Sequence, residues 1–215
     1  MSKIKSNHIF TSESVSEGHP DKICDQISDA ILDECIKLDP LSRVACETLT
    51  TTNLVINVGE ITCKYWNKIN PEDIARSVVH EIGYNNDELK FSSQSFEYVN
   101  RIHNQSADIS QGVTEGEGLF VEQGAGDQGM MFGYADNSTK EFMPAPIAFS
   151  HRLLDELQKL RKNGNIPYLR PDSKSQVSVK YEDGIPKEID SVVISHQTDD
   201  NLSLIHISEP TRPLE

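Results

Sequence analysis

The chain has 215 residues, of which 36% are hydrophobic, and it carries a formal net charge of −14. This length and apolar content suffice for one or two folded domains and exclude a disordered chain. The negative charge argues against nucleic acid as the main partner, since such binding depends on Lys and Arg that neutralise phosphates.

The sequence shows no sign of export or of a membrane span. Residues 1–7 are polar and are not followed by the apolar stretch of a secretory signal, and no segment approaches the length of a transmembrane helix. The four cysteines are widely spaced and form no Cys-x-x-Cys pair. We therefore expect reduced thiols, a cytoplasmic location and no membrane partner.

The first candidate site is the junction between a loop and a helix at Gly18-His19-Pro20-Asp21-Lys22. Apolar residues recur with helical period after this junction, and Asp39-Pro40 should end the helix. The first amides of a helix are unpaired and partly positive, so an anion could bind there, and Asp21 could hold a divalent cation against phosphate oxygens. Taken alone, the segment is better explained as the ordinary start of a helix.

Two runs rich in Val, Ile and Thr follow, at residues 43–51 and 54–63. A short turn at Thr52-Asn53 separates them, which predicts an antiparallel hairpin. Each run contains one glutamate, Glu47 in the first and Glu60 in the second. Because an unpaired carboxylate inside a sheet is costly, each glutamate either faces water or has a cation or a substrate amine as its partner.

Two further helices and a second pair of strands are predicted later in the chain. Asn70-Pro71 begins one helix and Gly83 ends it, while a second amphipathic helix spans 146–162. Residues 176–181 and 189–195 are predicted to be strands on either side of a tight turn. Helices that alternate with hairpin-forming strands indicate an α+β fold.

A long polar segment contains the second candidate site. Residues 104–118 form either an active-site lid or a mobile surface loop, since so long a loop is uncommon in a compact domain. Beyond it, Gln123-Gly124-Ala125-Gly126-Asp127-Gln128-Gly129 places three glycines around one Asp. Such glycines let a ligand approach the backbone closely, although a stretch of this kind is more often a turn.

Both candidate sites belong to a longer series of motifs that occur in one order along the chain. The others lie at residues 47–48, 59–62, 81–84, 105–109, 130–135, 143–146 and 169–177. Over roughly residues 7–199, the chain thereby resembles the S-adenosylmethionine synthetase family, also called methionine adenosyltransferase.

This resemblance implies a fold and an activity. The fold would consist of mixed or antiparallel sheets with helices packed on one face. The enzyme would transfer the adenosyl group of ATP to L-methionine and then cleave the triphosphate. It would use Mg²⁺, two ions per site, together with K⁺. It would assemble as a homodimer or homotetramer in which two subunits share each active site.

The resemblance also implies which residues bind ATP. His19 would donate a hydrogen bond to the triphosphate near the breaking C–O bond, and Lys174 would offer a compact cation to phosphate. These two residues would act in catalysis. Asp172 and Ser173 would contact ATP beside them, and Asp21 would bind a magnesium ion.

A second group of matching residues would bind methionine and the monovalent cation. Glu60 would meet the methionine amine, Gln105 at the edge of the lid would contact the same substrate, and Asp127 would lie beside methionine and the nucleoside. Glu47 would hold the potassium ion.

The family pattern divides the chain and then stops. It implies an N-terminal domain at 7–104, a flexible active-site loop at 105–121 and a truncated central domain at 122–200. The second half of the family, with a Gly-rich phosphate loop and a second metal-binding Asp, is absent. Residues 201–215 depart from the pattern and look in part like a translated transposase adapter, so we expect a non-native tail; a divergent native tail is the alternative.

Three functions are compatible with these observations. The first is a part of the synthetase that has little or no activity alone. The second is a non-catalytic fragment that at most binds nucleotide or a partner subunit. The third is a metal-dependent phosphohydrolase that uses His19 and Asp21, which leaves the matches at Glu60 and Gln105 unexplained.

Overall fold

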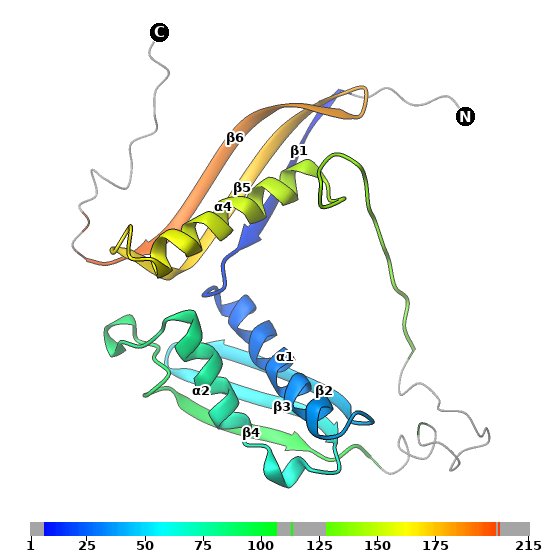
Figure 1. The fold of residues 1–215 in the computed structure, drawn as a ribbon, viewed down its shortest axis with the longest axis vertical. Helices are drawn as coiled ribbons and strands as arrows, with labels where there is room; N and C mark the ends of the chain where they lie inside the picture. The colour runs from blue at the N-terminus through cyan, green and yellow to red at the C-terminus, as the bar shows by residue number, and fades with distance from the viewer. Residues whose placement is uncertain (1–6, 107–112, 114–127, 201, 203–215) are drawn as a thin grey trace. The chain divides into compact units, whose positions relative to one another are not determined.

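The computed structural model describes residues 7–106, 113, 128–200 and 202 (Figure 1). The chain forms two compact units. The first unit consists of residues 1–22 together with 135–215, and the second unit consists of residues 23–134. The predicted domain boundaries at 104 and 122 follow the sequence rather than this packing, and they remain a proposal.

The second unit is built on a three-stranded mixed sheet with the order β2-β3-β4. Strands β2 (Arg43–Thr51) and β3 (Leu54–Thr62) are antiparallel, whereas β4 (Glu97–His103) runs parallel to β3. Helices α1 (Pro20–Leu38) and α2 (Pro71–Ile82) cover one face of this sheet (Figure 1). Two short 3₁₀ helices complete the unit, η1 (Trp66–Lys68) and η2 (Asp87–Leu89).

Branched aliphatic side chains form the core between these helices and the sheet. Ile27 and Ile31 of α1 are fully buried, as are Val55 of β3 and Val79 of α2. Burying one side chain of this size stabilises a fold by about 1.5–3 kcal/mol. The apolar periodicity that predicts helix α1 therefore corresponds to the face that packs on the sheet.

Helix α2 has the caps that its sequence predicts. The side chain of Asn70 accepts a hydrogen bond from the N–H of Glu72 (3.1 Å), and Pro71 occupies the first turn. Gly83 ends the helix in the left-handed region, with φ of 111°.

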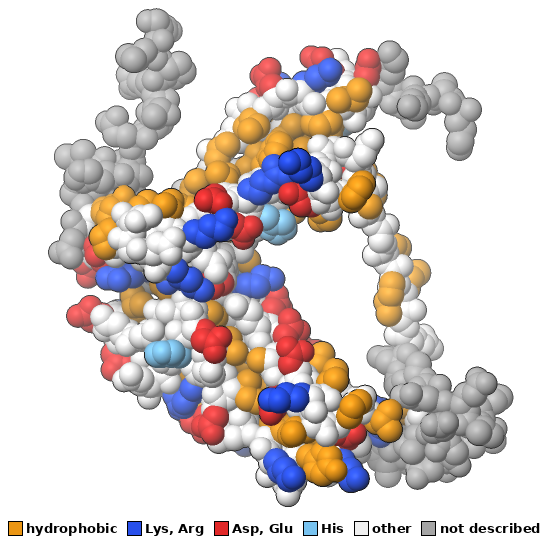
Figure 2. Space-filling view, viewed as in Figure 1, with side chains coloured by type: hydrophobic (Ala, Val, Ile, Leu, Met, Phe, Trp, Pro, Cys, Tyr) orange, Lys and Arg blue, Asp and Glu red, His pale blue; other side chains and the backbone are white. Residues whose placement is uncertain are grey.

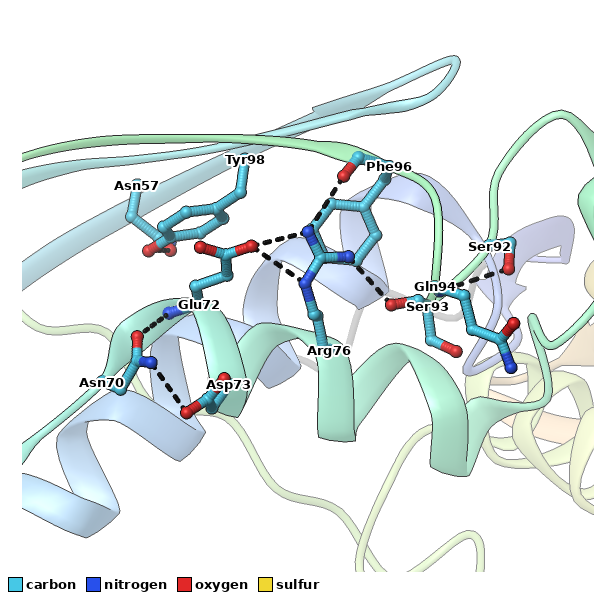
Figure 3. A network of polar contacts seen from close by, with 10 residues as sticks. All are labelled: Asn57, Asn70, Glu72, Asp73, Arg76, Ser92, Ser93, Gln94, Phe96 and Tyr98. Carbon is cyan, nitrogen blue, oxygen red and sulfur yellow. Dashed lines mark hydrogen bonds and ion pairs between the residues drawn. The ribbon is translucent and has the colours of Figure 1, made fainter.

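An arginine network holds α2 to the segment that leads into β4 (Figure 3). The guanidinium of Arg76 donates to the carboxylate of Glu72 (2.6 Å) and to the carbonyls of Ser93 (2.9 Å) and Phe96 (3.1 Å). It also lies over the ring of Phe96, 4.3 Å from the centroid. Because the planar guanidinium donates to several acceptors at once, Arg76 holds the segment that precedes β4 against α2.

The first unit is an antiparallel sheet with the order β1-β5-β6. Its strands are β1 (His8–Val15), β5 (Leu169–Glu182) and β6 (Ile185–Thr198). Helix α4 (Ala145–Lys162) packs across β1 and β5.

Hydroxyl groups connect α4 to both strands. Ser150 donates to the carbonyl of Ser12 (3.0 Å), and Ser175 donates to the carbonyl of Ser150 (2.8 Å). The side chains of Ser14 and His151 are hydrogen-bonded at 2.7 Å. These bonds fix the position of β1 and β5 against the helix. The bond to Ser14 gives His151 a structural role between α4 and β1.

The structure confirms the α+β class, with mixed and antiparallel sheets and helices on one face of each. Strands β1 and β4 were not predicted, and β5 and β6 are longer than expected. All four cysteines are free, as expected, and burial raises the pKa of Cys35 to about 12. Within the described ranges, no helix has the length and apolarity needed to span a membrane.

Candidate functional site

The loop that leaves β1 is tied to β5 through Ser16. The N–H of Ser16 donates to the carbonyl of Ser173 (2.9 Å), and its hydroxyl donates to the carbonyl of Pro171 (2.7 Å). The same hydroxyl accepts a hydrogen bond from the N–H of Ser173 (2.8 Å). Because Val15 is already the register partner of Lys174, these bonds extend the pairing into the loop. The two segments predicted to bind ATP, which are the loop after β1 and the first residues of β5, therefore lie beside each other.

His19 follows this anchor and immediately precedes helix α1. Its side chain is largely buried, and its N–H donates to the carbonyl of Ser16 (3.1 Å). The ring Nδ1 accepts a hydrogen bond from the N–H of Asp21 (3.2 Å), which makes the imidazole the N-terminal cap of α1. An accepting Nδ1 carries no proton, so the neutral ring holds its proton on Nε2. His19 can therefore cap the helix with one nitrogen and donate with the other.

Gly18 lets this loop lie directly against β5. A Cβ atom at position 18 would stand 2.3 Å from the Cβ of Pro171 and 2.5 Å from its carbonyl carbon. Such distances are far inside van der Waals contact, so any side chain would push the loop away from Pro171.

The predicted ATP residues of β5 differ in their surroundings. Ser173 is buried and is bonded to Ser16 through its N–H. Ser175 bonds to α4, so Lys174, the residue before it, faces away from the helix and is exposed. Asp172 has a buried oxygen, Oδ1, that has no hydrogen-bond partner in the described part of the chain. A buried carboxylate oxygen is costly without a donor, so this position suits a ligand donor.

The end of β6 contributes a second group of buried polar atoms near Asp172. His196 is the register partner of Ser173, and a ring nitrogen of His196, Nε2, is 3.0 Å from the carbonyl of Arg170. Its other nitrogen and the amide oxygen of Gln197 are buried without a partner in the region that the structure describes. Burial lowers the pKa of His196, which keeps the ring neutral.

In the second unit, Glu47 and Glu60 lie on the sheet face that the helices leave uncovered. Glu47 is opposite Val58 and Glu60 is opposite Ala45, so the two glutamates are diagonal neighbours on one face. Glu47 is exposed and Glu60 is half-buried. Within the described residues neither makes an ion pair, so both carboxylates are available to a cation or an amine.

Parallel pairing brings Gln105 to the same end of this sheet. Glu60 is the register partner of His103, and Gln105 follows two residues later. The side-chain oxygen of Gln105 accepts a hydrogen bond from Nε of Arg43 (3.0 Å). This bond leaves the amide NH₂ of Gln105 to act as a donor. Two of the three predicted methionine residues thus lie at the same end of this sheet, and Asp127, the third, lies outside the described residues.

The predicted metal ligands do not form a closed site. Asp21 has a side chain that is 88% exposed, and its carboxylate lies 3.8 Å from Nδ1 of His19. No group of three or more His, Cys, Asp or Glu converges anywhere in the described ranges. Magnesium is often held by one or two carboxylates together with substrate phosphates, so a lone carboxylate beside an anion site fits that mode.

A surface hollow of about 440 Å³ lies elsewhere in the first unit, beside the start of α4. It contains none of the predicted site residues. Its lining consists of Asn137, Ser138, Thr139, Lys140, Phe149 and Arg152.

Comparisons with known proteins agree with the sequence motifs. The chain matches the S-adenosylmethionine synthetase N-terminal domain at residues 7–107 and the central domain of the same synthetase at residues 122–212. The second match runs on into residues 201–212, so the interpretation of that tail as foreign sequence stays a prediction.

Many relatives carry the name S-adenosylmethionine synthase. The chain is 55% identical over 190 residues to the one from Desulfosudis oleivorans, which covers 88% of this chain and 48% of the relative. It is 58% identical over 191 residues to the one from Treponema denticola, covering 87% and 48%, respectively. For Syntrophobacter fumaroxidans the identity is 53% over 204 residues, covering 95% and 52%. The chain thus spans about half the length of these curated relatives.

Proposed function

The chain belongs to the S-adenosylmethionine synthetase family, and from this premise we propose that it forms part of an enzyme that makes S-adenosylmethionine from ATP and L-methionine. In this reaction a lone pair of the methionine sulfur forms a bond to C5′ of the ribose. The C5′–O bond breaks, and its electrons leave with the triphosphate, which water then cleaves to pyrophosphate and phosphate. Sulfur is a neutral nucleophile, so the barrier falls mainly through alignment and through stabilisation of the leaving charge.

The observation that carries this proposal is the geometry around His19. The helix cap fixes Nδ1 as an acceptor and leaves the Nε2 proton to be donated to the triphosphate oxygen that gains charge. Ser16 holds this loop against β5, where Asp172, Ser173 and Lys174 begin. A donor positioned in advance for such an oxygen lowers the activation free energy by about 2.7–4 kcal/mol.

The other ATP contacts have complementary roles. The exposed Lys174 would offer a cation to phosphate, and Ser173 and the unpartnered oxygen of Asp172 would receive other parts of the nucleotide. Charged contacts of this kind contribute roughly 1.5–3 kcal/mol each. Asp21 would hold a magnesium ion, which supplies positive charge to the triphosphate when it is bound.

The methionine side would be formed by Glu60, Gln105 and Asp127. A carboxylate and an amide donor at one end of the β2-β3-β4 sheet suit an amino-acid substrate, because they can meet its amine and its carboxylate. Glu47, on the same face as Glu60, would hold the potassium ion.

We further propose that this chain has little or no activity alone and that the whole protein assembles as a homodimer or homotetramer. The reason for the first proposal is that the relatives are about twice as long, and the second rests on the family resemblance. A cytoplasmic location likewise remains a prediction, which cell fractionation would test.

Calorimetry with an ATP analogue, with and without methionine, separates the synthetase from a non-catalytic fragment. Tighter nucleotide binding in the presence of methionine is the expected result for a working site. Nucleotide binding that ignores methionine would favour the non-catalytic fragment. Release of phosphate from ATP without any need for methionine would instead favour a phosphohydrolase.

A further inference from the structure

A buried carboxylate lies two residues before His19 and is held by the end of helix α4. Glu17 accepts a hydrogen bond from Nη2 of Arg161 (2.5 Å) on one oxygen. Its other oxygen accepts from Nζ of Lys162 (2.8 Å) and from the amide of Gln158 (2.8 Å). The side chains of Glu17 and Arg161 are only 14% and 12% exposed, so this pairing is largely screened from water.

The three donors lie on one face of the last turns of α4, because they are spaced three and four residues apart. The cations of this helix end would ordinarily be explained by their favourable interaction with the helix dipole. Their contacts give them a more specific partner, which is the loop between β1 and α1.

The loop has two anchors, which lie on consecutive residues just before Gly18 and His19. Ser16 fixes it to β5, and Glu17 fixes it to α4. Gly18 follows and packs against Pro171, and the N–H of His19 donates back to the carbonyl of Ser16 (3.1 Å). Without the Glu17 anchor, the loop would keep its bonds to β5 through Ser16 but lose its attachment to α4, so the loop could shift and move the imidazole with it.

Charge gives a second reason for this arrangement. A free carboxylate two residues from His19 would repel the triphosphate. Arg161 and Lys162 pair with this carboxylate and so offset its negative charge. Glu17 can therefore anchor the loop without placing an uncompensated negative charge beside the proposed triphosphate site.

We propose that Glu17 is a positioning residue, whose pairing with Arg161 and Lys162 at the end of α4 orients His19 toward the triphosphate. This inference rests on the proposed function, since it assigns an additional residue to the same reaction. Glu17 does not touch substrate in this account and acts only through His19.

The test compares variants of the full-length protein encoded by the complete reading frame. Glu17→Ala removes the anchor, whereas Glu17→Gln keeps an oxygen acceptor for Arg161. Lys159→Ala is the matched control, because Lys159 ends the same helix but pairs with Glu156 (2.6 Å) rather than with Glu17. It removes a positive charge from the last turn of α4, as Arg161→Gln does, and leaves the anchor intact.

Steady-state rates should separate orientation from binding. Because misplacement of a catalytic group by about 1 Å can cost roughly 100-fold, we expect Glu17→Ala to lower kcat by about 10- to 100-fold while KM for ATP changes by less than about threefold. Glu17→Gln should recover part of kcat, and Lys159→Ala should match the wild type. A kcat for Glu17→Ala equal to that of the wild type would overturn the inference.

Arg161→Gln provides a second route if Glu17→Ala does not fold. It should lower kcat in the same way, and when both single variants fold, combining them should cost no more than either alone, since they break one interaction. Fully additive losses would contradict a shared anchor.

NMR of the 215-residue chain tests the same point without catalysis. In the wild type, the ¹⁵N signals of His19, assigned with His19→Asn, should show one protonated and one unprotonated nitrogen. Glu17→Ala should average the two signals, and unchanged signals would refute the positioning role. If the full-length wild type makes no S-adenosylmethionine, the proposed function fails, and this spectrum still decides the role of Glu17.

Discussion

The imidazole of His19 joins local structure to chemistry because its two nitrogens have different tasks. Nδ1 accepts the N–H of Asp21 and so completes the first turn of α1. The remaining proton is thereby placed on Nε2, where a departing phosphate oxygen could receive a hydrogen bond. A side chain that only capped the helix would not explain why the adjoining loop is so closely held to β5.

The close contact between Gly18 and Pro171 makes a first prediction. Gly18→Ala should destabilise the first unit by about 1–3 kcal/mol, because the new methyl group would overlap backbone atoms of Pro171. Urea denaturation measures this change. The control is Gly133→Ala, where a Cβ meets no atom within 4 Å, so its effect should stay within about 0.5 kcal/mol. Equal effects of the two substitutions would contradict the described packing.

His196 makes a prediction about pH. Burial, with a contribution from Arg161, lowers the pKa of His196 below its ordinary value of 6.5, although the Arg170 carbonyl and Asp172 oppose this. The unfolded chain therefore binds a proton more readily than the folded chain, so acid favours unfolding. The free energy of unfolding should fall as the pH drops below about 6.5, and the fall should be smaller in His196→Asn.

Chemical denaturation at a series of pH values from about 7.5 to about 5, where histidine titrates, gives the free energy of unfolding as a function of pH. Parallel curves for the wild type and His196→Asn would show that this histidine is not held neutral by the fold.

Only part of the candidate site could be predicted from single residues. His19 and Asp21 are recognisable because a helix start has a local sequence pattern. Ser16 and Glu17 have no such pattern, since their partners lie about 141–157 residues away in the chain. A serine or glutamate in a loop is ordinarily a solvated residue. The pairing of β1 with β5 brings Ser16 to its partners, and the packing of α4 on this sheet brings Glu17 to its partners.

Among the secondary-structure elements, α2 depends on Arg76 for its attachment to the segment before β4. Arg76→Ala should lower the free energy of unfolding by about 1.5–3 kcal/mol, because it leaves the carbonyls of Ser93 and Phe96 without their charged donor. The exposed Arg101→Ala is the control and should change stability by less than about 0.5 kcal/mol. A similar loss in both variants would assign the effect to charge rather than to the network in Figure 3.

The predicted and the missed elements differ in how local their signals are. Helices α1 and α2 and the β2–β3 hairpin have apolar periodicity, caps or a tight turn within a few residues of each other. Strand β1 includes Thr11, Ser12, Glu13 and Ser14 in succession, and it becomes a strand by pairing with the distant β5. Strand β4 is short and contains Asn and Arg, and its pairing with β3 is parallel. Such pairings depend on tertiary structure that a window of sequence does not contain.

At the scale of the whole molecule, the first unit has an edge strand with unusual exposure. Most of the apolar side chains of β6 are about half exposed, and Figure 2 shows hydrophobic side chains along this sheet. The exposed set on β6 is Ile185, Ile189, Val192, Val193 and Ile194. Uncovered apolar edges of this kind favour association with other chain segments.

The length of the chain, about half that of its relatives, leads to a prediction about the isolated chain. Residues 1–215 alone should form S-adenosylmethionine at less than about 1% of the rate of the full-length protein, since several catalytic groups would be missing at once. An assay with isotope-labelled methionine measures both rates. Comparable rates would show that the chain is a complete enzyme by itself.

The most direct test of the central claim is the rate of S-adenosylmethionine formation by full-length His19 variants. Asparagine at position 19 can cap α1 but has no donor at the place of Nε2, so His19→Asn separates the two tasks of the imidazole. We expect kcat to fall by about 100- to 1,000-fold in His19→Asn while thermal stability stays near that of the wild type. An undiminished kcat in this variant would contradict the assignment of His19 as the donor to the departing triphosphate.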